Sequence, residues 1–136
     1  MDANELLLGI ERMRSDPNYY AAESLRQKVG GAEELVGSKS TVEGIAAARL
    51  LIVTWETIAV LLRGARGKDK IYEVTPICHM YDALLPAIKH FRSEAPQFAV
   101  EFEKLNNDYH AWLKKKKKKG DYVSAACRGL LHARFG

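Results

Sequence analysis

Apolar residues dominate positions 41–63, which form the hydrophobic centre of the sequence. The polar residues between positions 45 and 62 are Arg49, Thr54, Glu56 and Thr57. Arg49, Glu56 and Arg63 recur every seven residues, so on a helix they form one narrow polar stripe. The rest of that helix is apolar and must be covered on most of its circumference. The pattern therefore predicts a central helix around which the other elements pack.

The other hydrophobic positions also recur every three or four residues, and no stretch shows the sustained alternation of a strand. The segments predicted to be helical are 3–14, 17–29, about 76–92, about 94–119 and 122–134, with single turns at 32–36 and 69–74. The longest of these, 94–119, is expected to begin after Ser93 with Pro96 in its first turn.

Local signals set the expected helix ends. Asp16-Pro17 and Thr75-Pro76 are typical of a cap followed by proline at the first helical position. Ser40 followed by Glu43 fits a capping box, so the central helix is expected to begin there. Gly30-Gly31 is a stop signal. Pro86 is expected to kink or split the helix that contains it.

These patterns predict an all-α fold. A chain of 136 residues is normally one domain, and no linker divides it, so we expect a single helical domain over 1–136. We expect a compact bundle of five to six helices around the central helix at about 41–63. Complete burial of that helix inside the monomer is the favoured interpretation, and a subunit interface along part of its surface is the alternative.

Charge is distributed unevenly along the chain. Residues 1–60 hold six Lys and Arg against nine Asp and Glu, whereas residues 61–136 hold fifteen against eight. A basic excess concentrated in one part of a chain suggests an acidic partner, most often nucleic acid. A feature that only increases solubility is the alternative.

Two basic stretches account for much of this excess. The lysine run consists of Lys114, Lys115, Lys116, Lys117, Lys118 and Lys119, and the basic loop contributes Arg63, Arg66, Lys68 and Lys70. Six consecutive lysines point all round a helix and repel one another, and bound phosphates would relieve that repulsion. Neither stretch contains an aromatic residue, which favours contact with the phosphate backbone over stacking on bases. Solvated charge at a helix end is the alternative.

Lys39 lies in the sequence Gly37-Ser38-Lys39-Ser40-Thr41, which departs from a nucleotide-binding phosphate loop because Ser38 separates the glycine from the lysine. Lys39 and the neighbouring hydroxyls precede the central helix, whose N-terminus attracts anions. We therefore include Lys39 among the candidate phosphate-binding residues. Simple capping of the helix by a hydroxyl is the other interpretation.

No catalytic or metal-binding pattern is recognisable. Cys78, His79, Cys127 and His132 have none of the spacings of a metal site, and the two cysteines are expected to act as small apolar residues. Arg128 and His132 resemble the arginine–histidine pair of HEPN-type ribonucleases in residue type. That family places four to six residues within the pair and this sequence only three, so we do not carry the activity over. We expect no enzymatic activity, cofactor or metal ion.

The sequence predicts a non-enzymatic basic helical protein that binds nucleic-acid backbone, RNA or DNA, without sequence specificity. A small subunit of a larger nucleoprotein assembly fits this description, either in an RNA-guided interference complex or in a nucleoprotein filament. The expected partners are nucleic acid and other protein subunits or further copies of the chain. The alternative is a helical protein–protein adaptor with a solvated lysine-rich helix end. The N-terminus has no signal-peptide pattern, and Arg49 and Glu56 would be costly in lipid, so we expect an intracellular protein and no membrane partner.

Overall fold

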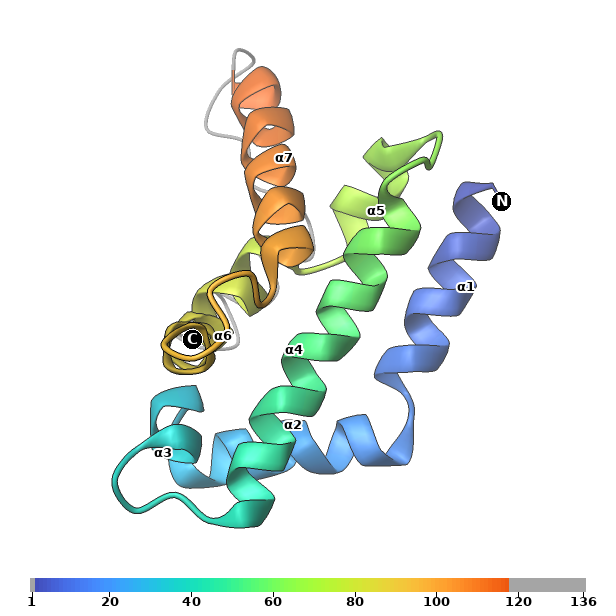
Figure 1. Cartoon of the computed structure of the whole chain (residues 1–136). Helices are drawn as coiled ribbons and strands as arrows, with labels where there is room; N and C mark the ends of the chain where they lie inside the picture. The colour runs from blue at the N-terminus through green and yellow to red at the C-terminus, as the bar shows by residue number, and fades with distance from the viewer. Residues whose placement is uncertain (1, 118–136) are drawn as a thin grey trace.

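Seven α-helices form the part of the protein that the structure describes, residues 2–117 of a computed structural model (Figure 1). The helices are α1 (Ala3–Arg14), α2 (Pro17–Val29), α3 (Ala32–Val36), α4 (Val42–Leu62), α5 (Lys68–Val74), α6 (Ile77–Arg92) and α7 (Val100–Lys117). These residues include no strand, which confirms the all-α class. Six described helices accompany the central one, α4, which agrees with the expected five to six helices around it. The helix expected at 122–134 lies outside the described residues.

The central helix is confirmed as α4, which packs against α1, α2, α3, α6 and α7 (Figure 1). Its buried residues are Gly44, Ala47, Ala48, Leu51, Ile52, Trp55, Ile58, Ala59 and Leu62. Small residues are frequent in this set, and they let neighbouring backbones approach closely. A Cβ atom added at Gly44, for example, would lie 3.1 Å from the Leu35 carbonyl oxygen.

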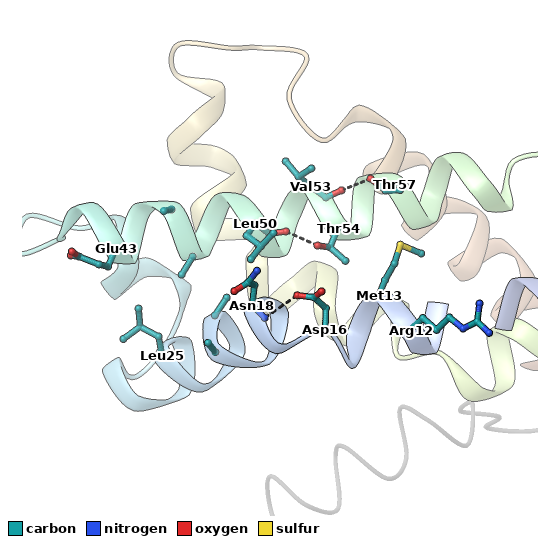
Figure 2. A pocket seen from close by; sticks show the side chains of 14 residues that line it. Arg12, Met13, Asp16, Asn18, Leu25, Glu43, Leu50, Val53, Thr54 and Thr57 are labelled. Atoms are coloured by element: carbon teal, nitrogen blue, oxygen red, sulfur yellow. Dashed lines mark hydrogen bonds between the residues drawn. The ribbon is translucent and has the colours of Figure 1, made fainter. Parts of the chain in front are cut away.

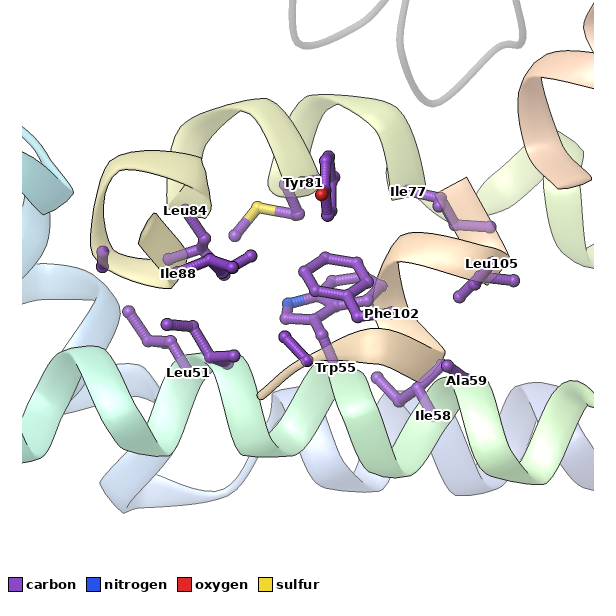
Figure 3. Packing of buried hydrophobic residues seen from close by; sticks show 14 of the residues in the cluster. Leu51, Trp55, Ile58, Ala59, Ile77, Tyr81, Leu84, Ile88, Phe102 and Leu105 are labelled. Atoms are coloured by element: carbon purple, nitrogen blue, oxygen red, sulfur yellow. The ribbon is translucent and has the colours of Figure 1, made fainter. Parts of the chain in front are cut away.

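Trp55 joins four helices at the middle of the core (Figure 3). Its ring stacks on Phe102 of α7, with the centroids 5.6 Å apart and the planes inclined by 17°. Phe102 in turn meets the ring of Tyr81 from α6 at nearly a right angle. The Trp55 Nε1 donates a hydrogen bond of 2.9 Å to the hydroxyl of Tyr19 on α2. A buried indole needs such a partner because it has lost water as an acceptor.

The opposite side of α4 is open to solvent in the described structure. Leu50 is 37% exposed, Val53 45% and Val60 46%. The described residues alone therefore do not bury α4 completely. The covering helices lie on one side of α4, and its other side keeps an apolar surface. By length and composition alone α4 is the one helix of the described residues that could span a membrane, although 39% of its most apolar window is buried.

Several helix ends follow the expected signals. The Asp16 carboxylate accepts a hydrogen bond of 2.8 Å from the Asn18 amide and caps α2 ahead of Pro17. Gly30 ends α2 in the left-handed region at φ +97°, a conformation that glycine adopts without a steric penalty.

Two predicted starts and the effect of Pro86 need correction. Thr41, not Ser40, caps α4, and its Oγ1 accepts a 2.9 Å hydrogen bond from the Gly44 amide. Ser40 instead closes a turn through its own amide, so the adjacent hydroxyl is the one placed to cap. Helix α6 begins at Ile77, after Pro76, and has no side-chain cap. It continues through Pro86 to Arg92, so the proline does not split it.

Helix α7 begins at Val100, later than the predicted residue 94. The preceding residues form turns in which the Arg92 Nε donates a 2.7 Å hydrogen bond to the carbonyl oxygen of Phe98. Ala99, just before α7, has a positive φ of 64° and a side chain that cannot accept a hydrogen bond. The first turn of α7 therefore has no side-chain cap from this residue.

Glu56 of α4 supplies an acceptor for the start of α7. Its Oε1 accepts a 2.6 Å hydrogen bond from the amide of Phe102. Burial raises the pKa of Glu56, hydrogen bonds from the Phe102 and Glu101 backbone oppose that change, and the charge of Glu101 adds to it. A half-buried carboxylate thus binds the free amides at a helix N-terminus, where the helix dipole favours negative charge.

The whole polar stripe of α4 faces the same region. The Arg49 guanidinium lies 5.2 Å from the centre of the Phe91 ring at the end of α6. Arg63 forms a 2.8 Å ion pair with Glu101 in the first turn of α7. The stripe predicted from the sequence therefore contacts α6 through Arg49 and α7 through Glu56 and Arg63.

We expect Glu56→Gln to gain stability relative to wild type as the pH rises. A carboxyl group whose folded-state pKa is raised stabilises the fold below its unfolded pKa, near 4.5, and this contribution is lost as pH rises through the folded pKa. Glutamine keeps an acceptor oxygen but does not ionise. Urea unfolding between about pH 4 and 7 measures the difference in unfolding free energy.

Glu56→Ala is the matched variant for the hydrogen bond itself. It leaves the Phe102 amide without this acceptor, so we expect it to be less stable than Glu56→Gln by about 1–3 kcal/mol at each pH. A pH-independent difference between wild type and Glu56→Gln would contradict the proposed burial of the charge.

Candidate nucleic-acid interface

The α4–α5 connection, α5 and the last turns of α7 lie at the same end of the molecule (Figure 1). Gly67 turns the chain into α5 with a φ of +72°, a left-handed conformation that favours glycine. Gly67 thus sets the direction in which α5 leaves the connection. Helix α5 begins at Lys68 and contains part of the basic loop.

An aromatic contact attaches α5 to α7. The Trp112 Nε1 donates a 2.6 Å hydrogen bond to the Asp69 carboxylate. The Tyr72 ring lies 5.2 Å from the Trp112 ring and 5.7 Å from the Tyr109 ring, between centroids. Burial raises the pKa of Tyr72, and the carboxylates of Asp108 and Asp69 raise it further, so its phenol stays neutral at physiological pH.

The same tryptophan connects the two basic stretches. The Lys116 Nζ lies 5.8 Å from the centre of the Trp112 ring on the α7 side, while Asp69, between Lys68 and Lys70, binds the indole nitrogen. Segments far apart in the sequence therefore meet at one end of the molecule, which we call the basic end. Its described basic residues are Arg63, Arg66, Lys68, Lys70, Lys104, Lys114, Lys115 and Lys116.

Three of the predicted lysines cannot be placed fully. Lys117 is the last residue of α7, and its side chain is outside the described structure. Lys118 and Lys119 lie outside the described residues, as do Cys127, Arg128 and His132.

Carboxylates reduce the charge on one side of the basic end. Glu101 pairs with Arg63 at 2.8 Å and approaches Lys104 at 3.9 Å. A small pocket of about 220 Å³ lies between α4, α5 and α7, and Asp108 lines it together with Lys68. Arg63 is therefore partly neutralised, although its side chain is still 62% exposed. Among the described residues of this end, cations outnumber carboxylates.

Lys39 lies away from the basic end. It precedes the N-terminus of α4, whereas Arg63 follows the C-terminus of the same helix. A 21-residue helix is about 30 Å long, so one phosphate does not contact both residues. The hydroxyl of Thr41 caps α4, and phosphate binding by Lys39 stays a prediction.

Sequence reasoning missed Lys104, Asp69 and Trp112 as parts of this surface. Lys104 lies three residues after Glu101 on α7, and this spacing puts the two on one helix face. Asp69 and Trp112 are 43 residues apart in the sequence, so no local sequence pattern predicts their contact.

Metal binding has no support in the described part of the chain, where no three His, Cys, Asp or Glu residues are grouped. Cys78 is half-buried and packs against the core.

Comparison of the chain with known protein families, with characterised proteins and with solved structures finds no match. The structure thus defines an all-α protein in which the α4–α5 connection, α5 and the end of α7 bring eight basic residues to one end.

We expect the Asp69–Trp112 hydrogen bond to couple α5 to α7. Asp69→Ala removes the acceptor, and Trp112→Phe removes the donor while keeping an aromatic ring. Each variant should lower the unfolding free energy, and the double variant should show a coupling of about 0.5–1.5 kcal/mol. Urea unfolding of wild type and the three variants measures it. Simple additivity would show that the contact does not hold α5 in place.

Proposed function

We propose that the basic end binds the phosphate backbone of nucleic acid without sequence specificity, as a non-enzymatic subunit of a larger nucleoprotein assembly. The observation that carries the proposal is the position of Trp112, which binds Asp69 in the basic loop and lies beneath Lys116 of the lysine run. Two basic segments that are separate in the sequence are thereby available to one polyanion.

The accessibility of the lysines and arginines supports this function. Arg66, Lys70, Lys114 and Lys115 are exposed, and none of them forms an ion pair with another described residue. Their mutual repulsion is unfavourable in the free protein. Phosphates that replace the counterions around these side chains would relieve it and favour binding.

The absence of a free stacking platform among the described residues of the basic end supports contact with the backbone. Trp112 is half-buried and packs on Tyr72, and Tyr72 itself is buried. Base-stacking proteins present aromatic faces to solvent instead. The side chains at this end offer charge, and charge alone does not distinguish one sequence from another.

We expect the affinity for oligonucleotides of unrelated sequence to fall steeply with salt. Neutralising each phosphate of a duplex adds about 0.9 to the slope of log affinity against log salt. The triple variant Lys114/Lys115/Lys116→Gln should therefore reduce the slope by up to about 3. Fluorescence anisotropy of labelled single- and double-stranded DNA and RNA across a salt series measures it.

Arg12/Lys28/Lys39→Gln is the matched control, since it removes the same charge from exposed positions outside the basic end. It should leave the slope close to the wild-type value. Arg66/Lys70→Gln should reduce the slope as well, by up to about 2, if both stretches contact one polyanion. Equal slopes for the control and the lysine variant would reject the basic end as the binding surface. Negligible binding by all forms would favour the protein–protein adaptor.

A further inference from the structure

Two hollows on α4 differ in character. The groove that α4 forms with α2 and the corner between α1 and α2 has a volume of about 820 Å³, and its lining is mainly apolar (Figure 2). The pocket between α4, α5 and α7 is smaller, about 220 Å³, and opens within the basic end. We call it the charged pocket. The charged residues that line it are Arg63, Lys68, Glu101, Lys104 and Asp108.

Both signs of charge are available in the charged pocket. Glu101 pairs with Arg63 at 2.8 Å and lies 3.9 Å from Lys104, so this carboxylate is engaged. Asp108 and the half-buried Lys68 form no ion pair with a described residue. A bare phosphate would match Lys68 but would be repelled by Asp108. The lining therefore fits a ligand that carries a hydrogen-bond donor beside a phosphate.

Tyr72 adds a hydroxyl group to the same lining. The residue is only 4% exposed, and its ring packs against Tyr109 and Trp112. Its hydroxyl forms no hydrogen bond with a described residue. Burial raises the pKa of Tyr72, and the nearby charge of Asp108 raises it further, so the hydroxyl keeps its proton. A buried hydroxyl without a partner is unfavourable, and a ligand with a polar group in the pocket would remove that cost.

The 2′-hydroxyl of ribose has the properties that this lining requires. A hydroxyl group can donate to the Asp108 carboxylate and accept from the Tyr72 hydroxyl at the same time. The phosphate on the neighbouring sugar carbon would then face Lys68. The charged pocket is smaller than the about 300–1,000 Å³ typical of small-molecule sites, so it suits a sugar and its phosphate better than a whole nucleotide.

We propose that the charged pocket binds the ribose 2′-hydroxyl of RNA and makes the basic end select RNA over DNA. The inference rests on the proposed function and narrows its ligand to one class of nucleic acid. It adds no sequence specificity, because every ribonucleotide carries the same 2′-hydroxyl. Deoxyribose has hydrogen at this carbon, so bound DNA would leave the Tyr72 hydroxyl and Asp108 unpaired.

Single strands of equal length made of uridine, 2′-deoxyuridine and 2′-O-methyluridine test the preference without changing the protein. Wild type should bind the uridine strand at least about 10-fold more tightly than the deoxyuridine strand. The 2′-O-methyl strand should bind like the deoxyuridine strand, because its ether oxygen cannot donate to Asp108. Free uridine monophosphate should not displace the uridine strand at a comparable concentration, because it lacks the flanking phosphates. Fluorescence anisotropy at one salt concentration measures all four ligands.

Tyr72→Phe removes one hydroxyl and no charge. It should lower the ratio of RNA affinity to DNA affinity by about 10-fold, to a value near one. Because the Tyr72 hydroxyl has no partner among the described residues, this variant should be no less stable than wild type in urea unfolding. A hydroxyl with a purely structural role would give lower stability and an unchanged ratio. Tyr20→Phe is the matched control, since Tyr20 is 70% exposed on α2, and it should keep the wild-type ratio.

Asp108→Ala tests the acceptor. Removal of a carboxylate from the basic end should strengthen the binding of both polymers through charge alone, but the ratio of RNA affinity to DNA affinity should fall. Asp82→Ala removes an exposed carboxylate from α6, outside the basic end, and should keep the wild-type ratio.

The possible failures differ in what they reject. Equal affinity of wild type for the uridine and deoxyuridine strands would overturn the inference and leave the proposed function standing. A preference that neither Tyr72→Phe nor Asp108→Ala reduces would remove the charged pocket as its cause. Displacement by uridine monophosphate at a comparable concentration would reject an RNA chain as the ligand in favour of a free ribonucleotide. Negligible binding of every strand would reject the proposed function, and this inference with it.

Discussion

The hydrogen bond from the Phe102 amide to Glu56 is the constraint on which the arrangement of the helices depends. Helix α7 follows a turn segment, and the residue just before it, Ala99, has no capping side chain. The Glu56 carboxylate of α4 supplies a side-chain acceptor to its first turn. Because Phe102 is also the ring that stacks on Trp55, the capping contact and the core contact fix the same turn of α7 against α4.

From that fixed turn, α7 extends beyond the core to meet α5. Trp112 lies about three helical turns beyond Phe102 on α7. There it donates a hydrogen bond to Asp69 of α5. The convergence of the basic residues is therefore a consequence of how α7 is anchored. A shift of one residue in the anchored turn would rotate Trp112 by about 100° around the helix and separate it from Asp69.

Most of the fold could be predicted from the sequence because the signals are local. The spacing of apolar residues located α1, α2 and α4, and Asp16 and Gly30 marked the two ends of α2 through contacts within a few residues. The start of α7 could not be located, because its cap comes from Glu56, 46 residues earlier. Likewise, we predicted Lys39 as a phosphate-binding residue from its charge and position before α4. The structure shows that the length of α4 lies between Lys39 and the basic end.

The exposed side of α4 was harder to predict for a different reason. An apolar helix must be covered, but its sequence does not say whether the cover comes from the same chain. Here the covering helices leave Leu50, Val53 and Val60 partly exposed, whereas Glu56 is used in the contact with α7.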